Sequence, residues 1–98
     1  MKNKKLKVLK FYKELPFNIY SSHSEMIRAI KNQNPLTAYP LLKKIIRKFK
    51  YPKVLDIGCG CGWFINSLTH HSNNVNCTGI DFNDKALKFA NKVKNKLK

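Results

Sequence analysis

Apolar residues in the first half of the chain recur every three or four positions, the spacing that places side chains on one face of an α-helix. This pattern predicts three helices before residue 53. The first covers residues 4–15 and ends at Pro16, and its apolar face among the lysines consists of Val8, Phe11 or Tyr12, and Leu15. A basic helix of this kind is either a surface helix that packs on its own domain or, less often, one that lies on an anionic membrane.

The second predicted helix begins at the sequence SHSE, which has the form of a capping box. The Ser22 hydroxyl and the Glu25 carboxylate would each accept a free backbone N–H of the first turn. Asn34-Pro35 ends this helix, whose apolar face is Met26, Ile27 and Ile30.

The third predicted helix has the strongest periodicity in the chain. Pro40 lies near its start, where a missing N–H is tolerated, and Tyr51-Pro52 ends it. We predict one continuous buried stripe along it, formed by Ala38, Leu41, Leu42, Ile45, Ile46 and Phe49.

From Lys53 onward the pattern changes to short β-prone runs that alternate with helical segments. KVLDI (53–57) predicts a buried strand and VNCTGID (75–81) a second one, with a turn at 72–74 before it. We predict a helix at residues 63–71, between the two strands, with Trp63, Phe64 and Leu68 facing inward.

A last helix follows the second strand, capped by Asn83 or Asp84, and its inner face is Ala86, Ala90, Val93 and Leu97. The resulting order is β-α-β-α. A crossover of this length joins parallel strands through a right-handed connection.

The segment VLDIGCGCGWF (54–64) joins the first predicted strand to its helix through three glycines at alternate positions. Glycines allow a tight turn and let a ligand approach the backbone, and the helix that follows presents free N–H groups. Asp81 ends the second strand 19 residues after Gly62, close to the spacing expected for an acid that binds ribose hydroxyls. Strand, loop, helix and acid together predict a site for a nucleoside-containing ligand.

This glycine pattern differs from the dinucleotide-binding fingerprint. The order is GxGxG, and Trp63 stands where that fingerprint has its third glycine. Asp56 precedes the first glycine by two residues and would repel a pyrophosphate, whereas it would attract a cationic group. A nicotinamide dehydrogenase is therefore disfavoured.

The segments VLDIGCGCGWF and GIDFND closely resemble motif I and the second-strand acid of class I S-adenosylmethionine-dependent methyltransferases. FYKELPFNIYSS and NPLTAYPLL resemble the N-terminal helical extension of one bacterial branch of that superfamily. The resemblance implies an α/β fold: an N-terminal helical extension over residues 1–52, then the first β-α-β-α of a Rossmann-like S-adenosylmethionine-binding domain over residues 53–98, truncated. The cofactor-binding residues that it implies are Asp56, Gly58, Cys59, Gly60, Gly62, Asp81 and Phe82.

The resemblance also implies roles for these residues. Asp56 and the backbone of residues 58–60 would face the methionine part of the cofactor, Asp81 the ribose hydroxyls, and Phe82 the adenine. The N-terminal helices would cover the cofactor, and Tyr12 or Tyr20 would reach it. No residue of this chain is assigned a catalytic role.

Each assignment has a structural alternative. Asp56 could serve only to order the loop by accepting backbone N–H groups, and Asp81-Phe82 could be a plain helix entry. Cys59 is interpreted as a small residue packed under the loop and Trp63 as a core residue, and the spacing of the cysteines and histidines does not favour a metal site.

The composition changes this picture only in part. The 98-residue chain has a net charge of +15, but all of its 20 basic residues except Arg28 and Arg47 are lysines. Lysine and asparagine rise together in proteins encoded by AT-rich DNA, and a surface poor in arginine is poorly suited to bidentate phosphate contacts, so nucleic-acid binding is possible but not favoured. The basic N-terminus lacks the apolar core of a signal peptide and no apolar run is long enough to span a membrane, so we expect a cytoplasmic protein with free thiols.

The resemblance implies a larger parallel sheet than the two strands predicted here. Parallel sheets need cover on both faces, so we expect an incomplete chain that is marginal alone or completed by another polypeptide. The first hypothesis is a methyltransferase whose acceptor is a small molecule. The alternatives are a non-catalytic S-adenosylmethionine-binding module or partner subunit, and a basic nucleic-acid-associated protein whose affinity would fall with salt.

Overall fold

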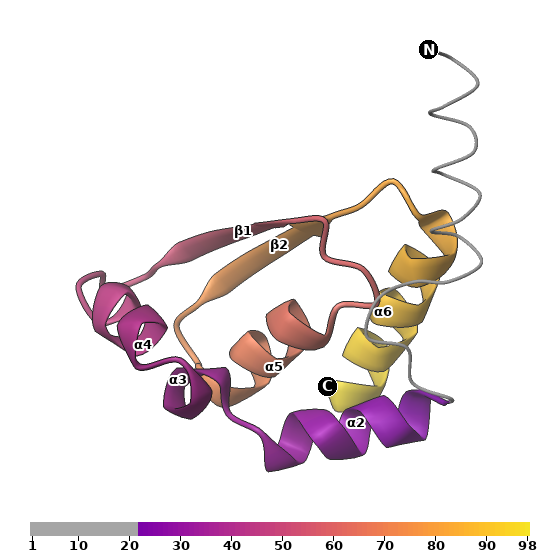
Figure 1. The fold of residues 1–98 in the computed structure, drawn as a ribbon, viewed down its shortest axis with the longest axis horizontal. Coiled ribbons are helices and arrows are strands. Elements are labelled where there is room, and N and C mark those ends of the chain that lie inside the picture. Colours follow the sequence, from indigo (N-terminus) through magenta and orange to yellow (C-terminus); the bar gives the residue numbers. More distant parts are fainter. Residues whose placement is uncertain (1–21) are drawn as a thin grey trace.

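The computed structural model describes residues 22–98, which contain five helices and two strands, labelled as in Figure 1. The predicted helix over residues 4–15, with Tyr12, and also Tyr20 lie outside the described residues. In chain order the elements are α2 (His23–Asn32), α3 (Pro35–Ala38), α4 (Pro40–Ile46), β1 (Lys53–Ile57), α5 (Trp63–His71), β2 (Asn76–Ile80) and α6 (Asp84–Leu97).

Strands β1 and β2 pair in parallel, as predicted, with Lys53 opposite Asn76 and Ile57 opposite Ile80. Helices α5 and α6 lie on one side of this sheet, and α2 packs against both of them on the side away from the strands (Figure 1). The arrangement is that of a partial Rossmann-like α/β fold.

The outer face of the sheet is uncovered within residues 22–98, so the prediction of a buried first strand is wrong. Leu55 is 58% exposed and Ile57 76%, and Ile80, the neighbour of Ile57 on β2, is 46% exposed. The alternation of a strand sends every second side chain to each face, and only the face toward α5 has a helix against it. The apolar run in the sequence therefore could not show whether the strand is covered on both faces of the sheet or on one face only.

The core consists of two clusters on the helical side of the sheet. Helix α2 meets α6 in the first cluster, whose buried members are Met26, Ile30, Cys61, Ala86 and Val93, with Ile27, Trp63, Phe89 and Leu97 packed against it. The second joins α4, α5 and the start of β2 through Ile46, Leu68 and Val75, with Phe64 and Val54 beside them. The inner faces predicted for α2, α5 and α6 are confirmed, as is the interpretation of Trp63 as a core residue.

The third predicted helix is wrong in its extent. It is divided into α3 and α4 at Tyr39, because Pro40 restricts the preceding residue to extended backbone and Tyr39 accordingly has φ −123° and ψ 85°. Only Ile46 of the predicted stripe is buried and Leu42 partly so. The remaining members point to solvent: Ala38, Leu41, Ile45 and Phe49.

Side-chain oxygens cap three of the described helices, two of them at cap residues predicted from the sequence. The Glu25 N–H donates to Ser22 Oγ (3.1 Å), which confirms half of the capping box. Asn34 caps α3, and Asn83, 2% exposed, caps α6 by accepting the Ala86 N–H at 3.2 Å. Of the two predicted caps of α6, Asn83 is therefore the one used.

Candidate functional site

The predicted site residues come together at the carboxyl ends of the two strands. Asp56 lies opposite Gly79 in the register, and Asp81 follows the last residue of β2 directly. Because the strands are parallel, both acids lie at the same edge of the sheet. The loop that leaves β1 starts at this edge (Figure 1). Asp56 and Asp81 are about 25 residues apart in the chain, and the single crossover through α5 brings them to the same edge of the sheet.

The loop between β1 and α5 depends on its glycines. Gly58, Gly60 and Gly62 have φ angles of 77°, 57° and 80°, a region that residues with a Cβ rarely adopt. A Cβ at Gly62 would also lie 2.7 Å from the Ala90 Cβ, whereas one at Gly58 would meet nothing within 4 Å. Gly58 is therefore required for its conformation and Gly62 for both conformation and space.

The N–H groups at the start of the loop are used by the protein itself. Those of Gly58 and Cys59 donate to the Ile80 carbonyl at 2.8 and 3.0 Å. The Gly60 N–H donates to Asp81 Oδ2 at 2.8 Å. The loop is thus attached to the end of β2 by three hydrogen bonds.

Asp81 orders both the loop and the start of the last helix. Its Oδ2 accepts the Gly60 N–H, and its Oδ1 accepts the Asn83 N–H at 2.7 Å. The sequence reasoning considered Asp56, not Asp81, as the acid that could order the loop. The signal for Asp81 was the Asp-x-Asn spacing, since an aspartate commonly accepts the N–H two residues later.

Asp56 accepts no hydrogen bond within residues 22–98, so the alternative in which it only orders the loop is not supported there. Partial burial, and then the negative charge of Asp81, raise the pKa of the Asp56 carboxyl. The charge of Asp81 disfavours the ionised form of Asp56, which indicates an excess of negative potential at this point. A cation placed between them would relieve it.

This arrangement favours a cationic ligand over a pyrophosphate. An anion at such a loop needs free N–H donors, and three of them are already bonded. Two carboxylates, those of Asp56 and Asp81, lie beside the loop instead. The first turn of α5 has no side-chain cap, so its N–H groups remain suited to a carboxylate.

Cys59 and Phe82 flank the loop. A Cβ at Gly79 would lie 2.8 Å from Cys59 Sγ, so the thiol packs against the strand as predicted for a small residue under the loop. Burial, and then the charges of Asp56 and Asp81, raise the pKa of the Cys59 thiol, which keeps it protonated. Phe82 is 55% exposed immediately after Asp81.

Cys59, Cys61 and Cys77 are free thiols. No three His, Cys, Asp or Glu side chains gather around a common point within the described part of the chain. None of the helices between residues 22 and 98 has the length and apolarity needed to cross a membrane.

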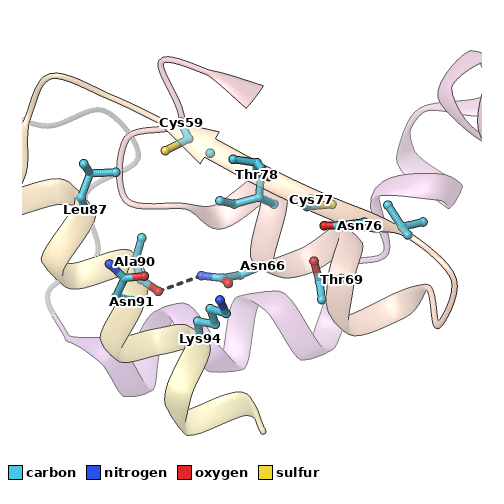
Figure 2. A pocket seen from close by; sticks show the side chains of 13 residues that line it. Cys59, Asn66, Thr69, Asn76, Cys77, Thr78, Leu87, Ala90, Asn91 and Lys94 are labelled. Atoms are coloured by element: carbon cyan, nitrogen blue, oxygen red, sulfur yellow. Dashed lines mark hydrogen bonds between the residues drawn. The ribbon is translucent and has the colours of Figure 1, made fainter. Parts of the chain in front are cut away.

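A cavity of about 590 Å³ lies beside β2, between α5 and α6 (Figure 2). Its walls combine thiols, amides and a lysine with apolar side chains, and Cys59 connects it to the underside of the glycine loop. Its polar residues were not predicted from the sequence: Asn66, Thr69, Asn76, Asn91 and Lys94. No sequence pattern marked Asn66, because only Trp63, Phe64 and Leu68 were expected to face inward on this helix.

A parallel β-α-β-α unit with a glycine loop after its first strand and an acid after its second is typical of Rossmann-like domains that bind a nucleoside-containing cofactor. Residues 48–98 match the family described as methyltransferase domain. The chain belongs to this family, the class I S-adenosylmethionine-dependent methyltransferases, as the resemblance implied.

Among curated proteins, the chain is similar to a release factor glutamine methyltransferase of Fusobacterium nucleatum, with 38% identity over 56 residues. The matched region is 55% of this chain and 16% of the relative, so the chain spans only a small part of that protein's length. No solved structure matches significantly.

Proposed function

We propose that this chain binds S-adenosylmethionine at the carboxyl edge of its sheet and contributes the methyl donor site of a methyltransferase. The observation that supports this proposal is the arrangement of the loop: its N–H groups are bonded internally, while Asp56 and Asp81 stand at its rim. S-adenosylmethionine carries an ammonium and a sulfonium, which suit such a site. Its carboxylate would lie against the uncapped first turn of α5.

Asp81 would bind the ribose hydroxyls while it continues to order the loop. An ionised carboxylate has about four lone-pair positions, and two of them accept the Gly60 and Asn83 N–H groups. The other two remain for a pair of vicinal hydroxyls. Phe82, exposed beside Asp81, would pack against the adenine.

When bound, the donor supplies an electrophilic methyl group on a positively charged sulfur. An acceptor nucleophile would take this methyl group, with the carbon–sulfur electron pair returning to sulfur and a proton leaving the acceptor. The residues of this chain bind and orient the donor, and holding two reactants in line can supply much of the rate enhancement in such a transfer.

Isothermal titration calorimetry of the full chain with S-adenosylmethionine tests the donor site. Asp81→Ala and Gly58→Val should abolish binding. Asp84→Asn, which removes a nearby acid of the same charge at the start of α6, should bind like wild type. Binding that survives both substitutions, or equal affinity for NAD, would refute the assignment.

For the acceptor, we propose a small molecule as the first candidate. A protein glutamine side chain is the second candidate, since the similar Fusobacterium protein is named for that substrate. Incubating the chain and a cell extract with methyl-labelled donor, then separating small molecules from protein, distinguishes the two. Label confined to the protein fraction would exclude the first.

We also propose that another polypeptide segment covers the outer face of the sheet. Leu55, Ile57 and Ile80 form an apolar surface there, and parallel sheets are normally covered on both faces. Such a segment would also build the acceptor pocket. Replacing Leu55 and Ile57 with Thr should improve the solubility of the chain and weaken its association with that segment. Unchanged association would count against this proposal.

A further inference from the structure

The side chain of Asn66 stands out as a polar group in the middle of a buried helix. It is 6% exposed, and asparagine in a helix interior is unfavourable unless its amide has a specific partner. Its Nδ2 donates to the carbonyl oxygen of Ala90 on α6 at 3.1 Å, and Figure 2 shows this bond crossing between the two helices at the wall of the cavity.

The same amide lies against the last glycine of the loop. A Cβ added at Gly62 would be 3.3 Å from Asn66 Nδ2 and 2.7 Å from the Ala90 Cβ. The Asn66 backbone N–H also donates to the Gly62 carbonyl at 3.0 Å. Gly62, Asn66 and Ala90 therefore meet at one point, with no room for an extra methyl group.

Helix α6 is thus attached to the glycine loop at two places. At its start, the cap residue Asn83 and the Gly60 N–H are both bonded to Asp81. Two turns later, Ala90 contacts Gly62 and accepts the Asn66 amide. A shift of α6 along or away from α5 would move Ala90 relative to Gly62, and with it the backbone that the loop presents to a ligand.

We propose that Asn66 is a positioning residue for methyl donor binding, whose amide holds α6 against Gly62 and so keeps the loop in its binding conformation. This inference rests on the proposed donor site. Apolar contacts alone permit helices to slide, whereas one directional hydrogen bond fixes the register of α6 on α5. Asn66 itself need not touch the donor.

The test compares Asn66→Leu, which keeps the branched shape of the side chain but removes the hydrogen-bond donor, with Asn91→Leu. Asn91 lines the same cavity from α6 but is exposed, so it serves as the matched control. Titration of the full chain with S-adenosylmethionine should give a dissociation constant about threefold to tenfold higher for Asn66→Leu than for wild type. The reason is that losing one hydrogen bond lowers the fraction of chains whose loop is in the binding conformation by at most about tenfold. The control should stay within about twofold of wild type.

Thermal melting with and without the donor separates positioning from general stability. A purely structural role would lower the melting temperature equally in both conditions, so the shift produced by the donor would be unchanged. Positioning instead predicts a smaller donor-induced shift in Asn66→Leu. An unchanged shift, or a dissociation constant within about twofold of wild type, would overturn the inference.

Hydrogen exchange on the wild-type chain provides a measurement that does not depend on a variant that folds. Donor binding should increase protection of the α6 amides of residues 90–94, which lie away from the carboxyl edge of the sheet. Protection confined to the loop and the start of α6 would contradict the inference. If the wild type binds no donor at all, the proposed function fails, and the inference fails with it. Normal wild-type binding with an unaffected Asn66→Leu variant refutes the inference alone.

Discussion

Replacing Gly62 with alanine should destabilise the fold far more than the same change at Gly58. The two glycines have nearly the same φ, 80° and 77°. They differ in their surroundings, because a Cβ would collide with Ala90 in one case and enter open space in the other. The pair therefore separates the conformational cost of alanine from its steric cost.

The magnitudes follow from these two contributions. A left-handed conformation costs a residue with a Cβ about 1–2 kcal/mol, which both variants share. Gly62→Ala adds overpacking against Ala90, a contact at 2.7 Å to an atom fixed on the helix backbone, and forcing a methyl group into a packed site costs about 1–3 kcal/mol. We expect a loss of unfolding free energy of about 1–2 kcal/mol for Gly58→Ala and about 2–5 kcal/mol for Gly62→Ala.

A second substitution tests whether the collision is with Ala90. Ala90→Gly removes the atom that a Cβ at position 62 would strike, and alone it should cost about 1 kcal/mol because glycine is unfavourable inside a helix. In the double variant, Gly62→Ala should cost about 1–2 kcal/mol less than in the wild-type background.

Urea denaturation of the full chain gives these free energies. Circular dichroism reports the helices, and the fluorescence of Trp63, the only tryptophan of the chain, reports the residue next to Gly62. Equal losses for Gly62→Ala and Gly58→Ala, or strict additivity with Ala90→Gly, would refute the packing of α6 on the loop.

Three further outcomes are expected. The folded state raises the pKa of the Asp56 carboxyl, so its protonation stabilises the fold below the unfolded pKa, and this contribution is lost as the pH rises through the folded pKa. Asp56→Asn should therefore raise the melting temperature more at pH 7 than at pH 4, and it should weaken S-adenosylmethionine binding. An equal gain in melting temperature at both pH values would contradict this. His71→Phe should lower the unfolding free energy by about 1–3 kcal/mol in urea titrations, because His71 Nε2 donates to the Ile30 carbonyl near the end of α2 at 2.7 Å; an unchanged midpoint would show that the bond is dispensable. The free thiols, whose pKa values are raised by burial, should react with iodoacetamide at pH 7.5 more slowly in the folded chain than in urea, and equal rates would refute their shielding.

Local signals in the sequence determined much of the fold. Periodicity identified the inner faces of α2, α5 and α6, and turn and cap residues such as Ser22 and Asn83 marked where helices begin. The glycine spacing and the acid after the second strand indicated the methyltransferase family, which the match over residues 48–98 confirms. The three glycines of the loop have positive φ, a conformation that residues with a Cβ rarely adopt. These features depend on residues close together in the chain.

Other features were decided only by the tertiary structure. The hydrophobic stripe from Ala38 to Phe49 was predicted to be buried, but Pro40 divides it and most of it faces solvent. The exposure of Leu55 and Ile57 likewise depends on which face of the sheet the helices cover.

The loop shows the same distinction at the level of single residues. Asp81, 21 residues away, supplies the carboxylate that orders Gly60, and Asn66 holds Ala90 of a different helix against Gly62. Such contacts join groups that are distant in the chain, and no local pattern records the distance between them. Local conformation follows from neighbouring residues, whereas the partner of a side chain is determined only when the whole chain packs.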